Sequence, residues 1–162
     1  MPDWLTHILI ALIISGLLGV KKKSLVVLGA LLPDLIVKSS LLGFFVHLPN
    51  TFNYMIGAFH TPIMSFLLSM AIAPLFKFDY LKTLLLINIG LVSHISADLL
   101  MRHFDGGQML FYPFSFKPYT LNVLWAEKYY LVLVPALVLY LLIKYYRHLQ
   151  IPQRKKYGDA EI

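Results

Sequence analysis

Residues 80–101 read YLKTLLLINIGLVSHISADLLM, and this stretch decides the fold. It is long enough to cross a bilayer, because a transmembrane helix needs ~20 mostly apolar residues. Its only ionisable side chains beyond Lys82 are His94 and Asp98. These two stand four residues apart, so one face of the predicted helix carries both. The stretch therefore predicts a membrane helix with a polar site built into it.

The whole chain shares this apolar character. Hydrophobic residues make up 59% of its 162 residues and charged residues 14%, whereas soluble domains average ~45–50% and ~25%. This composition excludes a soluble globular protein, a disordered chain and a disulfide-stapled module. The absence of cysteine also excludes thiolate metal sites and cysteine nucleophiles. The chain is predicted to be an integral membrane protein whose first partner is the lipid bilayer.

Four further apolar stretches approach the length of a membrane span, at residues 4–20, 24–48, 52–76 and 121–146. The predicted fold is all-α, a polytopic transmembrane helix bundle of about five membrane segments. Pro33, Asp34 and Lys38 interrupt the second segment, which is expected to be bent or re-entrant. One membrane-embedded helical domain is expected over residues 1–150. A polar, basic, disordered cytoplasmic tail is expected over residues 151–162.

The net charge of +6 is placed as in membrane proteins rather than as in nucleic-acid-binding proteins. Bases lie at the ends of apolar runs, namely KKK at residues 21–23, Lys77, Lys82 and RKK at residues 154–156. Such bases mark the cytoplasmic side. The chain is therefore expected to cross the inner (cytoplasmic) membrane several times, with its N-terminus outside and its C-terminus in the cytoplasm. No nucleic-acid partner is expected, and the oligomeric state stays open.

Ionisable side chains inside apolar segments are costly and mark candidate functional sites. Here they gather on the predicted outer side, and His60 and His94 fall at a similar depth, on the order of 10 Å below the helix ends at a rise of ~1.5 Å per residue. Imidazole and carboxylate ligands together suit a divalent metal, zinc first and manganese second. The candidate metal ligands are His7, Asp34, His60, His94 and Asp98, and the candidate catalytic carboxylates are Asp34, Asp98 and Glu127.

Each of these signals also has a purely structural interpretation. His94 and Asp98 can form a hydrogen-bonded pair that joins neighbouring helices. Asp34 can form a local ion pair with Lys38 at i+4. His60 can serve as an interhelical hydrogen-bond donor beside a proline. A glutamate in the first turn of a helix, as expected for residue 127, also compensates the helix dipole.

Several short motifs follow one another in a fixed order. They are Met1-Pro2-Asp3-Trp4-Leu5-Thr6-His7, Gly29-Ala30-Leu31-Leu32-Pro33-Asp34, His60-Thr61-Pro62, Ser93-His94 with Asp98, Gly106-Gly107 and Pro113-Phe114-Ser115. In this order they resemble the LexA-regulated, inner-membrane-associated family of metal-dependent hydrolases, over about residues 1–130. The family's second acidic residue soon after its Pro-Asp pair is absent, and Leu35 and Ile36 stand there instead.

The resemblance implies a membrane-embedded, metal-dependent hydrolase. The order of histidines and aspartates is also similar, more distantly, to that of zinc-dependent phospholipases C and single-strand nucleases, which favours a phosphoester or lipid-type substrate and a metal-activated water. A different class of function is a small ion or metal transporter with an intramembrane His/Asp site. A third is a non-catalytic scaffold in which the polar side chains join helices.

Overall fold

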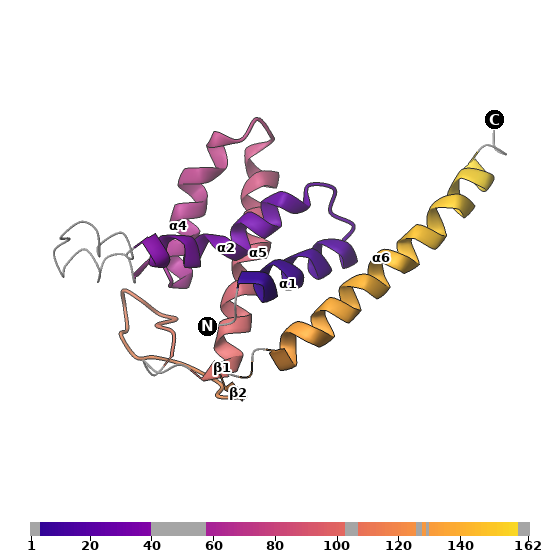
Figure 1. Ribbon diagram of the computed structural model, residues 1–162. Helices are drawn as coiled ribbons and strands as arrows, with labels where there is room; N and C mark the ends of the chain where they lie inside the picture. Colours follow the sequence, from indigo (N-terminus) through magenta and orange to yellow (C-terminus); the bar gives the residue numbers. More distant parts are fainter. Residues whose placement is uncertain (1–3, 40–57, 103–106, 126–127, 129, 159–162) are drawn as a thin grey trace.

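The computed structural model describes residues 4–39, 58–102, 107–125, 128 and 130–158. Within these residues the chain forms five α-helices (Figure 1). They are α1 (Trp4–Leu17), α2 (Lys23–Ser39), α4 (Pro62–Ile72), α5 (Tyr80–Leu100) and α6 (Tyr130–Gly158). A short 3-10 turn, η2 (Ala73–Leu75), follows α4, and strands β1 (Met101–Arg102) and β2 (Leu124–Trp125) form one small parallel pair. The all-α class predicted from the sequence is confirmed.

Helix α5 lies at the centre of the bundle, in contact with α1, α2 and α4. Two glycines let α2 and α5 approach closely. A Cβ atom on Gly29 would lie 1.9 Å from the Ile87 carbonyl oxygen, and one on Gly90 would lie 1.9 Å from the Val26 carbonyl oxygen. Small residues at such crossings are typical of helix packing in membranes. They bring the polar face of α5 against α2.

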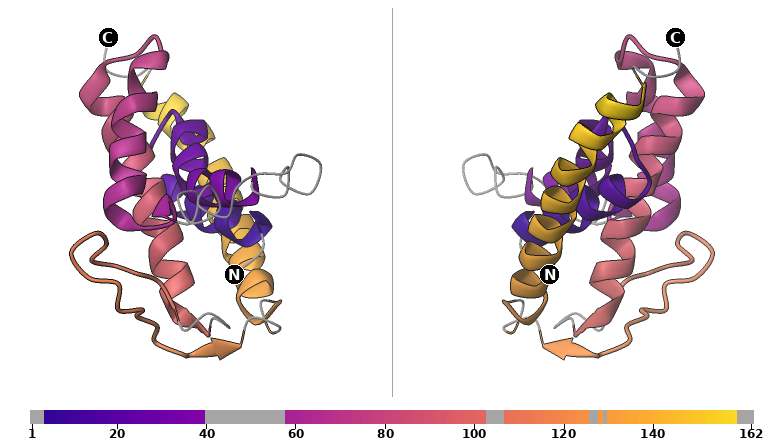
Figure 2. Two further views of the ribbon diagram at one scale, coloured as in Figure 1. Left: turned by 90° about the vertical axis from the view of Figure 1, so that its left-hand side faces the viewer. Right: turned by 90° about the vertical axis from the view of Figure 1, so that its right-hand side faces the viewer.

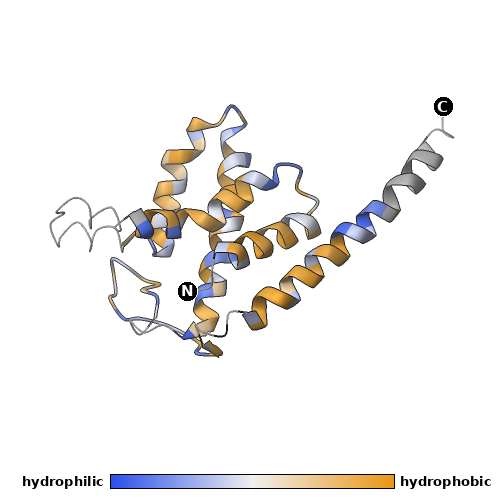
Figure 3. Cartoon of the chain, viewed as in Figure 1, coloured by the Kyte–Doolittle hydropathy of each residue, from blue (hydrophilic) through white to orange (hydrophobic). Residues whose placement is uncertain are grey.

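Helix α6 packs extensively on one other helix, α1. Leu9 and Ile13 of α1 and Ala136 of α6 form this contact. Helix α6 runs diagonally away from the other helices, and its C-terminal end lies far from them (Figure 1), while the right-hand view of Figure 2 shows the helix crossing in front of α1. Most of its first part is apolar, and polar residues begin further along (Figure 3). Exposed apolar side chains such as Leu142 (59% exposed) cover it, as expected for a helix that faces lipid.

Two helices in the described part of the chain are long and apolar enough to cross a membrane, α5 and the part of α6 from Tyr130 to His148. Helix α1 has 14 residues, about 21 Å at ~1.5 Å per residue, which is shorter than the ~30 Å hydrocarbon core. The expected number of about five membrane segments therefore stays a prediction. So does the course of the second segment, because residues 40–48 lie outside the described residues. Up to Ser39, α2 continues through Pro33.

The last apolar stretch differs from its expected form at both ends. Helix α6 begins at Tyr130 rather than at residue 121, because Leu124 pairs with Met101 in the β1–β2 ladder. The helix also continues through residues 151–158, where the sequence predicts a disordered tail. Beyond Pro152, which disfavours a helix interior, the glutamine, arginine and lysines of that tail have good helix propensities.

Candidate metal centre

Five ionisable side chains from four segments meet beside α5, the central helix of the bundle. His7 comes from α1, Asp34 from α2, His60 from the turn before α4, and His94 and Asp98 from α5. Four of them are at most 1% exposed, and the side chain of His60 is 12% exposed. Burial of five titratable groups in one small bundle is costly unless they pair or hold an ion.

His94 is fixed by its neighbour helix. Its Nδ1 atom lies 2.7 Å from the Ala30 carbonyl oxygen of α2, so this nitrogen carries the proton and donates it. Its Nε2 atom faces the cluster, 3.4 Å from Asp98 Oδ2 and 3.4 Å from His60 Nε2, and carries a lone pair in the neutral imidazole. A backbone carbonyl that fixes the tautomer in this way is a common feature of metal-ligating histidines.

Asp98 lies at the centre of the cluster. Its Oδ2 atom is 2.8 Å from His60 Nε2, and its Oδ1 atom is 3.4 Å from His7 Nε2. The His7 ring stacks on the His94 ring at a centroid distance of 4.0 Å. Three imidazoles thus surround one carboxylate, with ring nitrogens directed toward it.

His60 lies in a turn, not inside a helix as the third apolar stretch predicts. Helix α4 begins at Pro62, and Thr61 before it is extended, with φ −105° and ψ 153°. Proline is favoured at the first helical position and disfavours helical geometry in the residue before it. The Thr61-Pro62 pair therefore starts α4 and leaves the His60 ring at the mouth of the cluster.

Asp34 makes contacts that fit both of its interpretations. Its Oδ2 atom is 3.2 Å from Lys38 Nζ, the local ion pair expected at i+4. Its Oδ1 atom points to the cluster, 3.9 Å from His60 Nδ1. The Lys38 ammonium also lies 4.4 Å from the Trp4 ring centroid. One carboxylate oxygen is thus paired, while the other faces the histidines.

Several nitrogen and oxygen atoms in the cluster are better placed to bind a metal ion than to hydrogen-bond with one another. His7 Nδ1, Asp34 Oδ1 and His60 Nδ1 are buried without a hydrogen-bond partner in the described residues. Buried polar atoms are normally hydrogen-bonded, so each such atom calls for an explanation, an ion among them. Two triads have ligand atoms within 4.8 Å of one another, His7–His94–Asp98 and Asp34–His60–His94. The donor set therefore fits a divalent metal ion.

The two triads cannot each use a separate nitrogen of His94. Because Nδ1 is hydrogen-bonded to Ala30, only Nε2 can bind an ion. Both triads therefore converge on one atom. His94 could therefore ligate one ion through Nε2, and the surrounding imidazoles and carboxylates could hold that ion alone or a close pair.

Gln108 belongs to the cluster and was not expected from the sequence. Its Nε2 donates to Asp98 Oδ2 over 3.0 Å, and the residue is 5% exposed. The backbone of Gln108 exchanges two hydrogen bonds with Tyr119. Gly107 has a φ of +125°, and a Cβ atom there would lie 2.3 Å from the Tyr119 carbonyl oxygen. A glycine before a polar residue in a loop is the only sequence signal for this partner, and it is a weak one.

The remaining catalytic candidate, Glu127, lies outside the described residues. Its expected role as a general base therefore stays a proposal. The roles of His7, Asp34, His60, His94 and Asp98 as metal ligands are likewise proposals, although their side chains lie together. The motif Gly106-Gly107 is described only from its second glycine onward.

These features define a class, namely a helical membrane protein with a buried His/Asp group that could hold a metal ion. Residues 1–157 match the family model described as YdjM inner membrane protein, so the chain belongs to the YdjM inner membrane protein family. The protein is accordingly a protein of the inner membrane. No curated protein and no solved structure matches the chain.

Proposed function

We propose that this protein is a metal-dependent hydrolase of the inner membrane, acting on a phosphoester or lipid-type substrate. The observation that carries the proposal is the buried cluster itself, in which ligand atoms of His and Asp residues lie close together and buried atoms of His7, Asp34 and His60 have no hydrogen-bond partner in the described residues. A purely structural network would be expected to leave fewer buried atoms without partners.

His94, His7 and Asp98 would form the central part of the metal site, with Asp34 and His60 completing it. A set with three imidazoles and two carboxylates favours zinc, with manganese as the second choice. When bound, the ion would supply Lewis acidity and an activated water nucleophile. Gln108 would orient Asp98 through its hydrogen bond, as outer partners of metal ligands commonly do.

Two residues near the cluster would handle substrate and protons. Lys38, whose side chain is 39% exposed, stands at the edge of the buried cluster and would attract a phosphate oxygen of the substrate. Glu127, which is expected to open the last apolar segment on the same side, would accept a proton from the attacking water. Both assignments belong to the proposal.

A long apolar groove beside the cluster supports a lipid-type substrate. Its volume is about 610 Å³, and α1 and α5 supply most of its lining. The lining includes Thr6, Ser93 and Ala97, each of which directly precedes a member of the cluster. The groove thus runs along the same helix turns that hold the histidines and Asp98. An acyl chain in the groove would keep the polar part of a lipid near the cluster.

The proposal is tested by measuring hydrolysis with protein in detergent micelles. Phospholipids, simple phosphate esters and carboxylic esters are supplied with zinc or manganese and, separately, with a chelator. We expect turnover of a phosphoester that the chelator abolishes and that Asp98→Asn lowers by at least about 100-fold. The matched control is Asp79→Asn, because Asp79 caps the other end of α5 and should leave turnover unchanged. Metal binding without turnover across the panel would contradict the hydrolase proposal.

A second candidate function, ion or metal transport, is favoured by a polar strip between α4 and α5. Ser65, Ser69 and Thr83 are fully buried there, and Asn88 donates to Ser69 Oγ over 2.9 Å. The strip lies in α4 and in the first half of α5, where few polar residues are expected from the sequence. Transport would give metal flux into proteoliposomes that depends on both Asp34 and Ser69, whereas hydrolysis would not require Ser69, which does not line the apolar groove.

The orientation of the chain also belongs to the proposal. The N-terminus would lie outside and the C-terminus in the cytoplasm, since bases such as Lys21 and Lys77 mark the cytoplasmic side. This orientation would place the metal site toward the outer leaflet. Single cysteines introduced at residues 21 and 117 test this orientation when a membrane-impermeant reagent is added from outside. We expect the cysteine at residue 117 to be labelled and the one at residue 21 to stay unlabelled.

A further inference from the structure

A second cavity lies between α6 and the ends of α1 and α2, away from the His/Asp cluster. Its volume is about 540 Å³, within the ~300–1,000 Å³ range of small-ligand pockets. Gly16 on α1 lines it, nine residues after His7, which is about 14 Å along the helix at ~1.5 Å per residue. The cavity and the candidate metal centre are therefore separate sites.

One wall of this cavity is basic. Lys23 comes from the first turn of α2, and Lys144, Arg147 and His148 come from α6. The described lining contains no carboxylate. Arg147 has a structural role, since its guanidinium donates to the Gly16 carbonyl oxygen near the C-terminal end of α1, where cations are favourable. Within the described residues, no ion pair neutralises Lys23 or Lys144.

The other wall is apolar, which distinguishes this cavity from a site for a soluble anion. Leu12, Leu141 and Ile143 line it together with Tyr140. A smaller cavity of about 410 Å³ adjoins it and shares Gly16, Ile143 and Arg147. Cationic groups beside a continuous apolar surface match a ligand with an anionic head and hydrocarbon chains.

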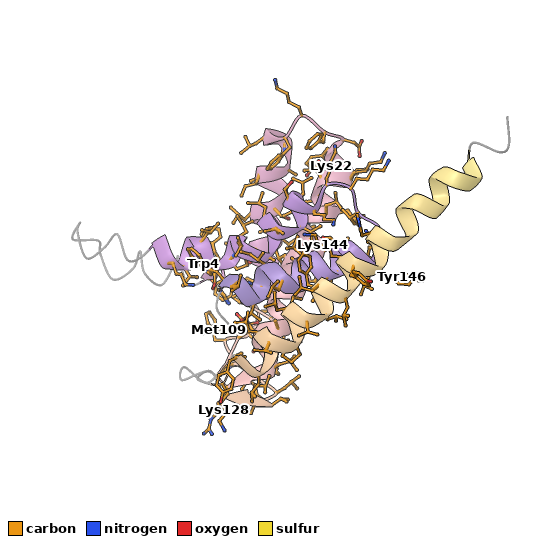
Figure 4. All side chains as sticks on the ribbon, turned by 45° about the vertical axis from the view of Figure 1, so that its right-hand side comes forward. Trp4, Lys22, Met109, Lys128, Lys144 and Tyr146 are labelled. Atoms are coloured by element: carbon orange, nitrogen blue, oxygen red, sulfur yellow. The ribbon has the colours of Figure 1, made fainter. Side chains whose placement is uncertain are left out.

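The depth of the cavity matches the headgroup region of a bilayer. The apolar span of α6 ends at His148, so the basic residues occupy its last turn. Tyr145 and Tyr146 are 64% and 63% exposed in the same turn, and tyrosines of this kind sit at the membrane–water interface. Figure 4 shows Lys144 and Tyr146 on α6, well along the helix from Lys128, which precedes it.

We propose that this cavity binds the phosphate group of an anionic phospholipid of the surrounding bilayer. Lys23 and Lys144 would contact the phosphate, and the apolar wall would hold the upper part of an acyl chain. Basic pockets between membrane helices at the interface are known to bind anionic headgroups in this way. The bound lipid would join α6 to α2, which do not pack extensively on each other, beside the existing contact of α6 with α1.

The test uses the full chain in detergent micelles doped with dioleoyl-phosphatidylglycerol or dioleoyl-phosphatidylcholine. The thermal unfolding midpoint is followed as a function of lipid concentration. We expect phosphatidylglycerol to raise the midpoint and phosphatidylcholine to leave it unchanged. The double variant Lys23→Gln/Lys144→Gln should need at least about tenfold more phosphatidylglycerol for half of the effect, since each base near an anionic surface contributes appreciably.

The matched control is Lys21→Gln/Lys77→Gln, which removes two exposed bases outside the cavity. If the midpoints of both double variants respond alike to phosphatidylglycerol, the effect comes from general surface charge and the proposal is overturned.

Millimolar inorganic phosphate replaces the lipid in a third arm, and an equal rise of the unfolding midpoint would overturn the choice of a lipid. Native mass spectrometry of the folded variants gives an independent readout. Retention of one phosphatidylglycerol by the wild type and its loss from Lys23→Gln/Lys144→Gln are expected, and equal retention by the two would overturn the proposal.

Discussion

Helices α5 and α6 are both long and apolar enough to cross a membrane, yet they take opposite places in the molecule. In their apolar windows, 44% of the α5 residues are buried and only 6% of the α6 residues. Apolarity alone cannot produce this difference. Helix α5 carries Gly90, Ser93, His94 and Asp98 on its buried side, whereas the apolar span of α6 carries many bulky residues that are exposed, such as Leu137, Leu141 and Leu142.

The comparison shows what places a helix inside a membrane bundle. In lipid the hydrophobic effect does not favour one apolar helix over another, so association depends on close packing of small residues and on polar contacts. Helix α5 has both, and α2 supplies the complements in Gly29 and the Ala30 carbonyl oxygen. Helix α6 has less of both, since Ala136 packs on α1 and Arg147 donates to the Gly16 carbonyl oxygen near the end of its apolar span, and it stays at the periphery.

The largest expected effect is on the glycine contact that distinguishes α5. Gly90→Val would add a whole side chain at a position where even a Cβ atom would lie 1.9 Å from the Val26 carbonyl oxygen. Because backbone rather than a flexible side chain is in the way, the loss of stability should reach or exceed the upper end of the ~1–3 kcal/mol typical of overpacking. Thermal unfolding in detergent measures it. The control Val138→Leu on α6 should change stability by less than ~0.5 kcal/mol, and equal losses for both variants would contradict the account.

The next largest effect is expected from the carboxylate of α5. Asp98→Asn removes the charge that three imidazoles and Gln108 face. Metal ions that bind the folded state raise its stability, so zinc should raise the unfolding midpoint of the wild type and not that of this variant. Affinity should fall by at least about 100-fold, since even outer partners of metal ligands are worth 10–100-fold. An unchanged response to zinc would place the metal elsewhere.

A smaller effect is expected from Gln108, which touches Asp98 from outside the helices. Gln108→Leu should lower zinc affinity by about 10–100-fold without abolishing binding. The control Ser115→Ala lies in the same loop and should leave affinity unchanged. Isothermal titration of zinc into the detergent-solubilised protein measures both, and a Gln108→Leu variant with wild-type affinity would remove this residue from the site.

The smallest effect is expected on the exposed face of α6. Leu142→Val exchanges one apolar side chain for another at a position that is 59% exposed. Stability and zinc affinity should both stay within error, with less than ~0.5 kcal/mol of change. A large loss of stability would show that this face packs against protein, such as a second copy of the chain, rather than against lipid.

Much of the helical content of α5 could be predicted from the sequence, because length and composition define an apolar helix. The spacing of His94 and Asp98 also places both on one face whatever the neighbours are. The close α2–α5 crossing was not predicted, although Gly29 and Gly90 permit it. A glycine in a helix signals a contact only when the partner helix is known.

Loops limited the prediction elsewhere. Gln108 reaches Asp98 through a backbone pairing with Tyr119 that no local pattern indicates. The apolar residues at 121–125 are typical of a membrane span, but Leu124 pairs with Met101 instead and delays α6 to Tyr130. His60 was expected inside a helix, whereas Pro62 starts the helix after it. In each case a long-range contact or the geometry of a proline outweighed apolar composition.

The central claim is that the histidines and aspartates gathered around α5 hold a metal ion. It is tested most directly by the metal content of the purified full-length protein after loading with zinc or manganese and removal of free ion, measured by inductively coupled plasma mass spectrometry. We predict one or two ions per chain in the wild type and in Asp79→Asn, and almost none in His94→Ala. A folded wild-type protein without bound metal, or a His94→Ala variant with full occupancy, would contradict the account.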